Sequence, residues 1–147
     1  MSLTDFSQLN IGDTVVETEI ELSRASLVDY TGASGDHNPI HWSERFATEV
    51  GLDGVIADGM LSMAVVVAPI VEWLGDPGAI VDYRTRFSAP VLVPDAESGT
   101  PATPTAVLSL TATIGAIDGA VGTARIDVTV KSGEKDVLSR TQIRVTR

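Results

Sequence analysis

The sequence has no cysteine and only two histidines, which narrows the choice of catalytic side chains. Without cysteine the chain has neither disulfides nor a thiolate nucleophile. Bases are scarce as well: 10 Lys and Arg face 20 acidic residues, for a formal net charge of −10. No run of bases offsets phosphate repulsion, so the composition excludes nucleic acid and anionic membranes as partners.

Long apolar segments are also lacking. The longest, residues 63–74, contains Pro69 and Glu72 and is too short to span a bilayer. Residues 1–5 lack the basic and apolar regions of a signal peptide, so we expect a soluble, cytoplasmic protein. Apolar residues make up 44 % of the 147 residues, which suits one packed domain over residues 1–147, or a subunit whose core a partner completes.

Hydrophobic periodicity predicts a strand, small helices, one long helix and then four strands. The strands are expected at 15–22, 80–87, 106–117, 121–131 and 137–145, the long helix at 58–74, and short helices from residue 23 and at 43–50. The turn-forming residues of 32–39 predict a loop. Pro69 predicts a kink or break near residues 65–66. The order indicates an α+β fold in which a curved antiparallel sheet surrounds one helix.

The most informative segment is residues 30–41, in which Asp36 and His41 flank the turn-forming pair Asn38-Pro39. A carboxylate and an imidazole held by a rigid bend are the minimum needed to move protons near neutral pH. Each residue alone has a simpler interpretation, because a Gly-Asp pair usually forms an Asx turn and a lone histidine is usually structural.

The spacing of Gly35-Asp36-x-Asn38-Pro39-x-His41, with Tyr30 before it and Ala47 after it, resembles the motif of the MaoC-like (R)-specific enoyl-thioester hydratases. The resemblance implies a hot-dog fold and favours the catalytic interpretation of the pair. Segments 51–53, 73–79 and 83–87 are similar to the catalytic subunits of mycobacterial-type (3R)-hydroxyacyl-carrier-protein dehydratases. The resemblance to the family motif also implies that Tyr30 and Asn38 belong to the substrate site.

The implied reaction is reversible hydration of a trans-2-enoyl thioester to the (R)-3-hydroxyacyl thioester. Asp36 and His41 would activate water for attack at C3, and which of them is the formal base stays open. Gly59 N–H, at the start of a buried helix, would hold the thioester oxygen; close packing is the alternative role of this glycine. Water and the acyl chain supply all the reactants, so no metal or redox cofactor is expected.

Two neighbours of Gly59 raise separate questions. The family commonly has histidine where this chain has Asp58, a good N-cap that places negative charge beside the expected oxyanion site. Ser62, one turn later, either contacts substrate or bonds to the carbonyl of Asp58, and the second role is slightly favoured. For Arg86 and Phe87 we expect an ion pair and a core position, respectively.

A metal site is not predicted. His37 and His41 have i,i+4 spacing, but Pro39 between them interrupts helical regularity, and there is no third histidine. We therefore expect His37 to face solvent.

The expected partners are the thioester substrate, on coenzyme A or acyl carrier protein, and a second hot-dog subunit in a homodimer or heterodimer. Arg84, Arg86 and the C-terminal arginines are the cations available to an anionic carrier. Two alternatives stay open. One is thioester hydrolysis on the same fold, and the other is a non-catalytic partner subunit.

Overall fold

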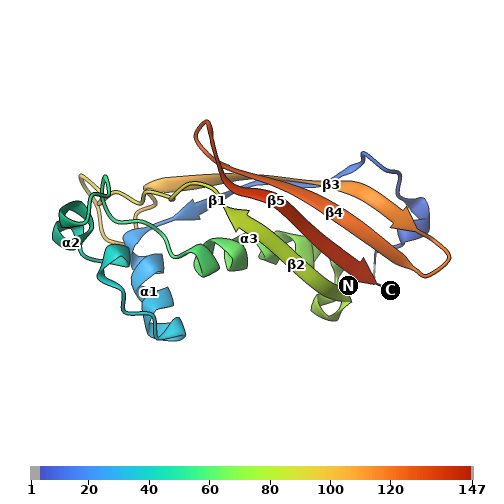
Figure 1. The fold of residues 1–147 in the computed structure, drawn as a ribbon, viewed down its shortest axis with the longest axis horizontal. Coiled ribbons are helices and arrows are strands. Elements are labelled where there is room, and N and C mark those ends of the chain that lie inside the picture. Colours follow the sequence, from blue (N-terminus) through green and yellow to red (C-terminus); the bar gives the residue numbers. More distant parts are fainter. Residues whose placement is uncertain (1–3, 147) are drawn as a thin grey trace.

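A five-stranded antiparallel sheet lies over one long helix in the computed structural model, which describes residues 4–146 (Figure 1). The strand order is β1-β3-β4-β5-β2, so β1 and β2 form the two edges. The strands are β1 (Thr14–Leu22), β2 (Ile80–Phe87), β3 (Ala106–Asp118), β4 (Thr123–Ser132) and β5 (Lys135–Thr146). The helices are α1 (Arg24–Ser34), α2 (Glu44–Glu49) and α3 (Gly59–Leu74), with 3-10 turns η1 (Phe6–Gln8), η2 (Pro39–His41) and η3 (Pro77–Ala79). The predicted α+β architecture is confirmed.

The core lies between α3 and the concave face of the sheet. Strand β3 alternates buried and more exposed residues along most of its length, as expected for a sheet with one face against a core. Helix α3 contributes buried residues at helical spacing, and these belong to the same cluster as the buried strand residues. The main members are Leu61, Val66, Ile70, Leu108, Leu110, Ile126 and Ile143.

Both ends of α3 are where the sequence predicts them. The Asp58 side chain accepts a hydrogen bond from Met60 N–H at 2.7 Å, and Gly75 ends the helix with φ of 76°. Of the predicted kink or break, the break is wrong, because α3 is continuous through Pro69, and the kink stays a prediction. Val66 and Ile70, on either side of that proline, are fully buried. Packing of these side chains holds the helix where one backbone hydrogen bond is lost.

Two local predictions need correction. The predicted 32–39 loop begins later, because α1 continues through Ser34 and ends at Gly35, whose φ is 74° and whose N–H bonds to the Thr31 carbonyl. The alternation of β2 is interrupted by two register shifts against β5. Phe87, at the end of β2, is not in the core as expected but 53 % exposed.

The small helices lie together at one end of the sheet, beside the N-terminus of α3 (Figure 1). The segment between α2 and α3 is fastened to its neighbours by backbone hydrogen bonds. Ile56 N–H bonds to the Ile40 carbonyl at 3.2 Å, and Ala57 N–H bonds to the Val91 carbonyl at 2.9 Å. These bonds place the start of α3 against η2, which carries His41.

Candidate active site

The bend that carries Asp36 is built from consecutive side-chain-to-backbone hydrogen bonds. Asp36 Oδ1 accepts the Asn38 N–H at 2.9 Å, and Asn38 Oδ1 accepts the Ile40 N–H at 3.3 Å, which caps η2. The Asx turn expected of an isolated Gly-Asp is thus present. It fixes one oxygen of the Asp36 carboxylate and leaves the other available. Asn38 shapes this bend, and its role toward substrate stays a prediction.

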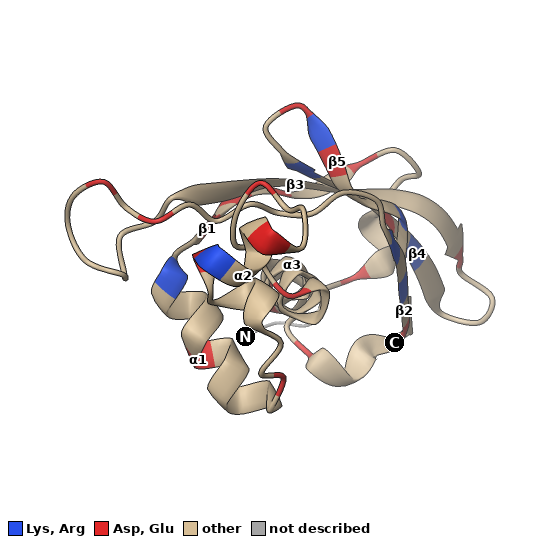
Figure 2. Ribbon diagram, turned by 60° about the vertical axis from the view of Figure 1, so that its left-hand side comes forward, with Lys and Arg blue, Asp and Glu red and all other residues tan. Residues whose placement is uncertain are grey.

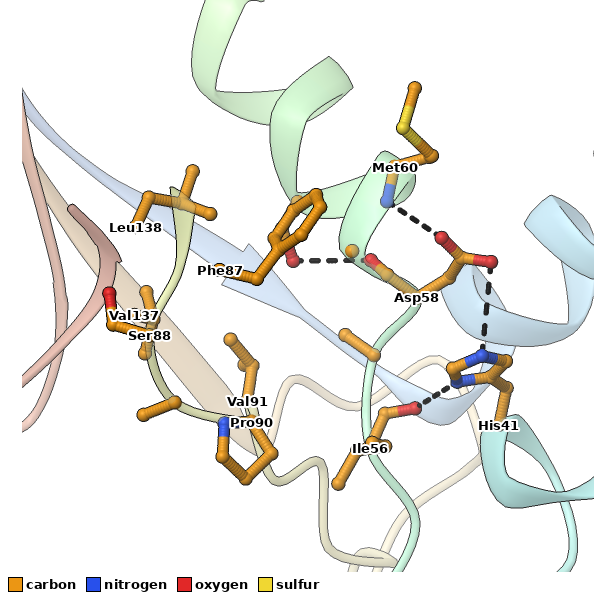
Figure 3. A pocket seen from close by; sticks show the side chains of 14 residues that line it. His41, Ile56, Asp58, Met60, Phe87, Ser88, Pro90, Val91, Val137 and Leu138 are labelled. Atoms are coloured by element: carbon orange, nitrogen blue, oxygen red, sulfur yellow. Dashed lines mark hydrogen bonds and ion pairs between the residues drawn. The ribbon is translucent and has the colours of Figure 1, made fainter. Parts of the chain in front are cut away.

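His41 is 8 % exposed, and its ring is held in one orientation. Its Nδ1 lies 2.8 Å from the Ile56 carbonyl oxygen, which can only accept, so Nδ1 carries the hydrogen. The other ring nitrogen, Nε2, lies 3.8 Å from Oδ2 of Asp58 (Figure 3). The imidazole therefore presents Nε2 toward the start of α3.

Asp36, His41 and Asp58 form one cluster, in which the nearest carboxylate oxygens and ring nitrogen lie within 4.8 Å of one another. The two residues paired from the sequence do converge. Asp58 is the member that the sequence does not place with this pair, since it is expected to cap the helix and to put negative charge beside the oxyanion site. The Asp58 side chain caps α3 through Oδ1 and also belongs to the cluster, because its Oδ2 faces His41.

The Asp36 carboxylate is held in its ionised form. The Asn38 backbone N–H is the main cause that lowers the pKa of Asp36 below its ordinary value. Desolvation opposes this shift, and the Asp58 side chain and the charges of His41 and His37 add to it. Burial raises the pKa of the Tyr30 hydroxyl, and the negative charges of Asp58 and Asp36 raise it further. Tyr30 thus stays protonated beside the cluster, where its O–H is a hydrogen-bond donor.

A cavity of about 440 Å³ opens beside the cluster, between the start of α3, the end of β2 and β5 (Figure 3). His41, Asp58, Gly59 and Ser62 line its polar side. Asp36, Asn38 and Tyr30 are not lining residues, and Asp36 reaches the cavity rim only through its position beside His41 and Asp58. The remaining wall is largely apolar and includes Ile56, Met60, Phe87, Pro90, Val91, Val137 and Leu138.

Gly59 brings bare backbone to this cavity. A Cβ at this position would lie 2.8 Å from Cε1 of Phe87, so the aromatic ring packs directly against the glycine. As the first residue of α3, Gly59 has no intrahelical acceptor for its N–H, and none is found for it within residues 4–146. Both expected features of the glycine, close packing and a free N–H, are therefore present together.

Of the other sequence predictions, those for Ser62 and His37 are confirmed and that for Arg86 is not. The Ser62 Oγ donates to the Asp58 carbonyl at 3.2 Å, which confirms the favoured of its two roles. His37 is exposed as expected, with Nδ1 2.8 Å from the Gly35 carbonyl, and it stands apart from the cluster. The expected ion pair of Arg86 is not found in the part of the chain that the structure describes, where Arg86 is exposed and Arg84 pairs with Asp82.

None of the helices within the described residues has the length and apolar character needed to cross a membrane. Negative side chains outnumber positive ones on the helices and loops around the site, where Arg24 and Arg45 lie on α1 and α2, and most other positive side chains lie on β2, β4 and β5 (Figure 2). The cluster therefore lies in a predominantly acidic part of a protein with a net charge of −10.

The sequence pattern of the MaoC-like domain family matches residues 6–100, which include the whole cluster. A 3-hydroxybutyryl-CoA dehydratase of Methylorubrum extorquens is 34 % identical over 91 residues, covering 61 % of this chain and 57 % of that protein. An (R)-specific enoyl-CoA hydratase of Rhodospirillum rubrum is 35 % identical over 80 residues, covering 54 % of this chain and 56 % of that protein.

Among solved structures, a MaoC-like dehydratase superposes with a TM-score of 0.89 at 35 % identity, covering 98 % of this chain and 42 % of that chain. The match extends over β3, β4 and β5, beyond the part that the family pattern covers. The chain spans less than two thirds of the length of each of these three relatives.

Proposed function

Because the chain belongs to the MaoC-like domain family, we propose that it catalyses the reversible hydration of trans-2-enoyl thioesters to (R)-3-hydroxyacyl thioesters. The observation that supports this most strongly is the convergence of Asp36 and His41 beside a cavity that begins at the N-terminus of α3. Both curated relatives carry names of hydratase or dehydratase type, which agrees with the proposal.

In the hydration direction, a water molecule bound between Asp36 and His41 attacks C3 of the enoyl group. The Asp36 carboxylate, whose pKa is lowered, and Nε2 of His41 both accept hydrogen bonds from that water. The pair takes the proton that the water loses and returns a proton to C2. Dehydration follows the same path backwards.

Negative charge develops on the thioester oxygen as water adds, and the free N–H of Gly59 is the donor that meets it. The N-terminal end of α3 adds partial positive charge at the same place. The carboxylate of Asp58 opposes this field, but its Oδ1 is engaged by Met60 N–H and its Oδ2 faces His41. Donation by Gly59 therefore remains available to the substrate.

The apolar wall of the cavity suits the acyl chain of the substrate, and the coenzyme A or acyl carrier protein that bears this chain remains outside the cavity. Met60 and Phe87, which are 56 % and 53 % exposed, lie at the cavity and leave a large apolar surface in contact with solvent. A second hot-dog subunit would cover that surface, as a homodimer or as a heterodimer. Coenzyme A and acyl carrier protein are both anionic, and Arg86, which is exposed on β2 and has no ion pair among residues 4–146, is suitably placed for either.

Hydrolysis of the thioester is the alternative reaction, since the same carboxylate could direct water to C1. The two reactions are distinguished by incubating purified protein with crotonyl-CoA. We expect the absorbance of the conjugated enoyl group to fall while no free thiol appears, because water adds to the double bond and the thioester stays intact. Stoichiometric release of free coenzyme A would favour hydrolysis. If the absorbance does not fall and no free thiol appears, although the protein is folded, the result would favour a non-catalytic partner subunit.

A further inference from the structure

We propose that Asp36, His41 and Asp58 form a binding site for one late first-row divalent cation such as Zn²⁺, and that the cation inhibits the enzyme when bound. The three side chains come from three separate places in the sequence, the bend, η2 and the residue before α3. They gather one imidazole nitrogen and two carboxylate oxygens within 4.8 Å. Binding of the cation does not depend on the proposed function, whereas the inhibition does.

Each of the three ligands is oriented by a backbone group, which leaves one atom available to the cation. His41 Nδ1 bonds to the Ile56 carbonyl at 2.8 Å and leaves Nε2. One oxygen of Asp36 accepts the Asn38 N–H at 2.9 Å, and one oxygen of Asp58 accepts the Met60 N–H at 2.7 Å. Such outer hydrogen bonds, which fix ring tautomer and carboxylate orientation, are typical of metal ligands in proteins.

The spacing suits a small cation. Ligand atoms about 2.0–2.1 Å from a tetrahedral Zn²⁺ are about 3.3 Å from one another. His41 Nε2 and Asp58 Oδ2 are 3.8 Å apart and all three ligand atoms lie within 4.8 Å of one another, so rotations of the side chains bring them to this distance when the cation binds. His41 is largely buried and its Nε2 has no hydrogen-bond donor or acceptor among residues 4–146 beyond the facing carboxylates. His41 and Asp58 are therefore oriented before the cation binds, whereas Asp36 lies on the exposed bend.

The donor set selects the kind of cation. One imidazole with two carboxylates favours Zn²⁺, Co²⁺ or Ni²⁺ over Mg²⁺ and Ca²⁺, which take mainly oxygen ligands and more of them. Two carboxylates also compensate the charge of a divalent cation. A bound cation occupies Nε2 of His41 and an oxygen of Asp36, the two groups that the proposed hydration needs.

The test is a titration of untagged, chelator-treated protein with CoCl₂, followed by visible absorbance, and with ZnCl₂, followed by calorimetry. We expect one cation per chain and the intense bands of a low-symmetry Co²⁺ site. The variant H41Q should lose the bands, and D58N should weaken binding at least tenfold. The matched control is H37Q, which removes the only other histidine, is exposed, and should bind as the wild type does.

Circular dichroism identifies any variant that fails to fold. The variant D36N tests the third proposed ligand independently and should also weaken binding of the cation. The proposal is overturned if H37Q and H41Q lose binding equally, if H41Q retains it, or if the wild type binds no Co²⁺ at millimolar concentration. In a hydration assay, Zn²⁺ should inhibit and a chelator should restore the rate. Stoichiometric binding through His41 without inhibition would leave the site standing and contradict the catalytic role of His41, so the two proposals fail separately.

Discussion

Replacing Asp36 by asparagine is expected to lower kcat for hydration by about 10²- to 10⁴-fold, the range that a positioned acid or base contributes. The asparagine side-chain oxygen can still accept the Asn38 N–H and preserve the bend, but it cannot hold or accept the proton. His41→Ala should lose activity to a similar extent, because no other imidazole lies in the cluster. Steady-state rates with crotonyl-CoA measure both effects.

The control for this pair is Asp29→Asn, an exposed carboxylate on α1 outside the cluster and the cavity lining, which should leave kcat unchanged. Thermal unfolding of each variant separates loss of chemistry from loss of fold. Because Asp36 and His41 act on one water molecule, the double variant should be little worse than either single variant. Full activity in Asp36→Asn or His41→Ala would refute the pair.

Replacing Gly59 by alanine is expected to lower kcat/KM by about tenfold or more, equivalent to about 1.4 kcal/mol of transition-state stabilisation. The new Cβ would lie 2.8 Å from the Phe87 ring, closer than real contacts allow. Phe87 is half exposed and can rotate, so the ring would be driven toward the cavity that it lines. Initial rates at several substrate concentrations separate the effects on KM and kcat.

A second substitution tests this explanation. In the double variant Gly59→Ala/Phe87→Ala the clash is removed, and we expect activity to recover toward that of Phe87→Ala alone. Gly32→Ala is the matched control, because its Cβ would meet no atom within 4 Å and the residue lies inside α1. If Gly59→Ala has full activity, neither close packing nor the approach of substrate to this backbone matters for the reaction.

Much of the architecture follows from local patterns. The capping residues Asp58 and Gly75 and the apolar character of 59–74 suffice to place the long helix, and turn residues separate the last three strands. The Asp36–His41 pair could also be found, because its members are five residues apart in one bend. Its convergence is a local property of that bend and of η2.

The features that the sequence patterns could not predict depend on contacts between segments that are distant in the sequence. Asp58 joins the cluster because Ile56 bonds to Ile40 and pairs with Leu92 in an isolated β-bridge, which seats the start of α3 against η2. Phe87 is exposed because it lines the cavity, where its ring packs against Gly59 of α3, and the β2 sequence alone gives no sign of that cavity. The continuity of α3 through Pro69 likewise results from burial of its neighbours by the sheet.

The reaction in oxygen-18 water tests most directly whether the cluster directs water to C3. Crotonyl-CoA is incubated with the protein, and the products are analysed by mass spectrometry with chiral separation. We expect the label in the 3-hydroxyl group of an intact (R)-3-hydroxybutyryl thioester, in wild type and not in Asp36→Asn. Label in the carboxylate of a released acid, with the double bond retained, would contradict the account.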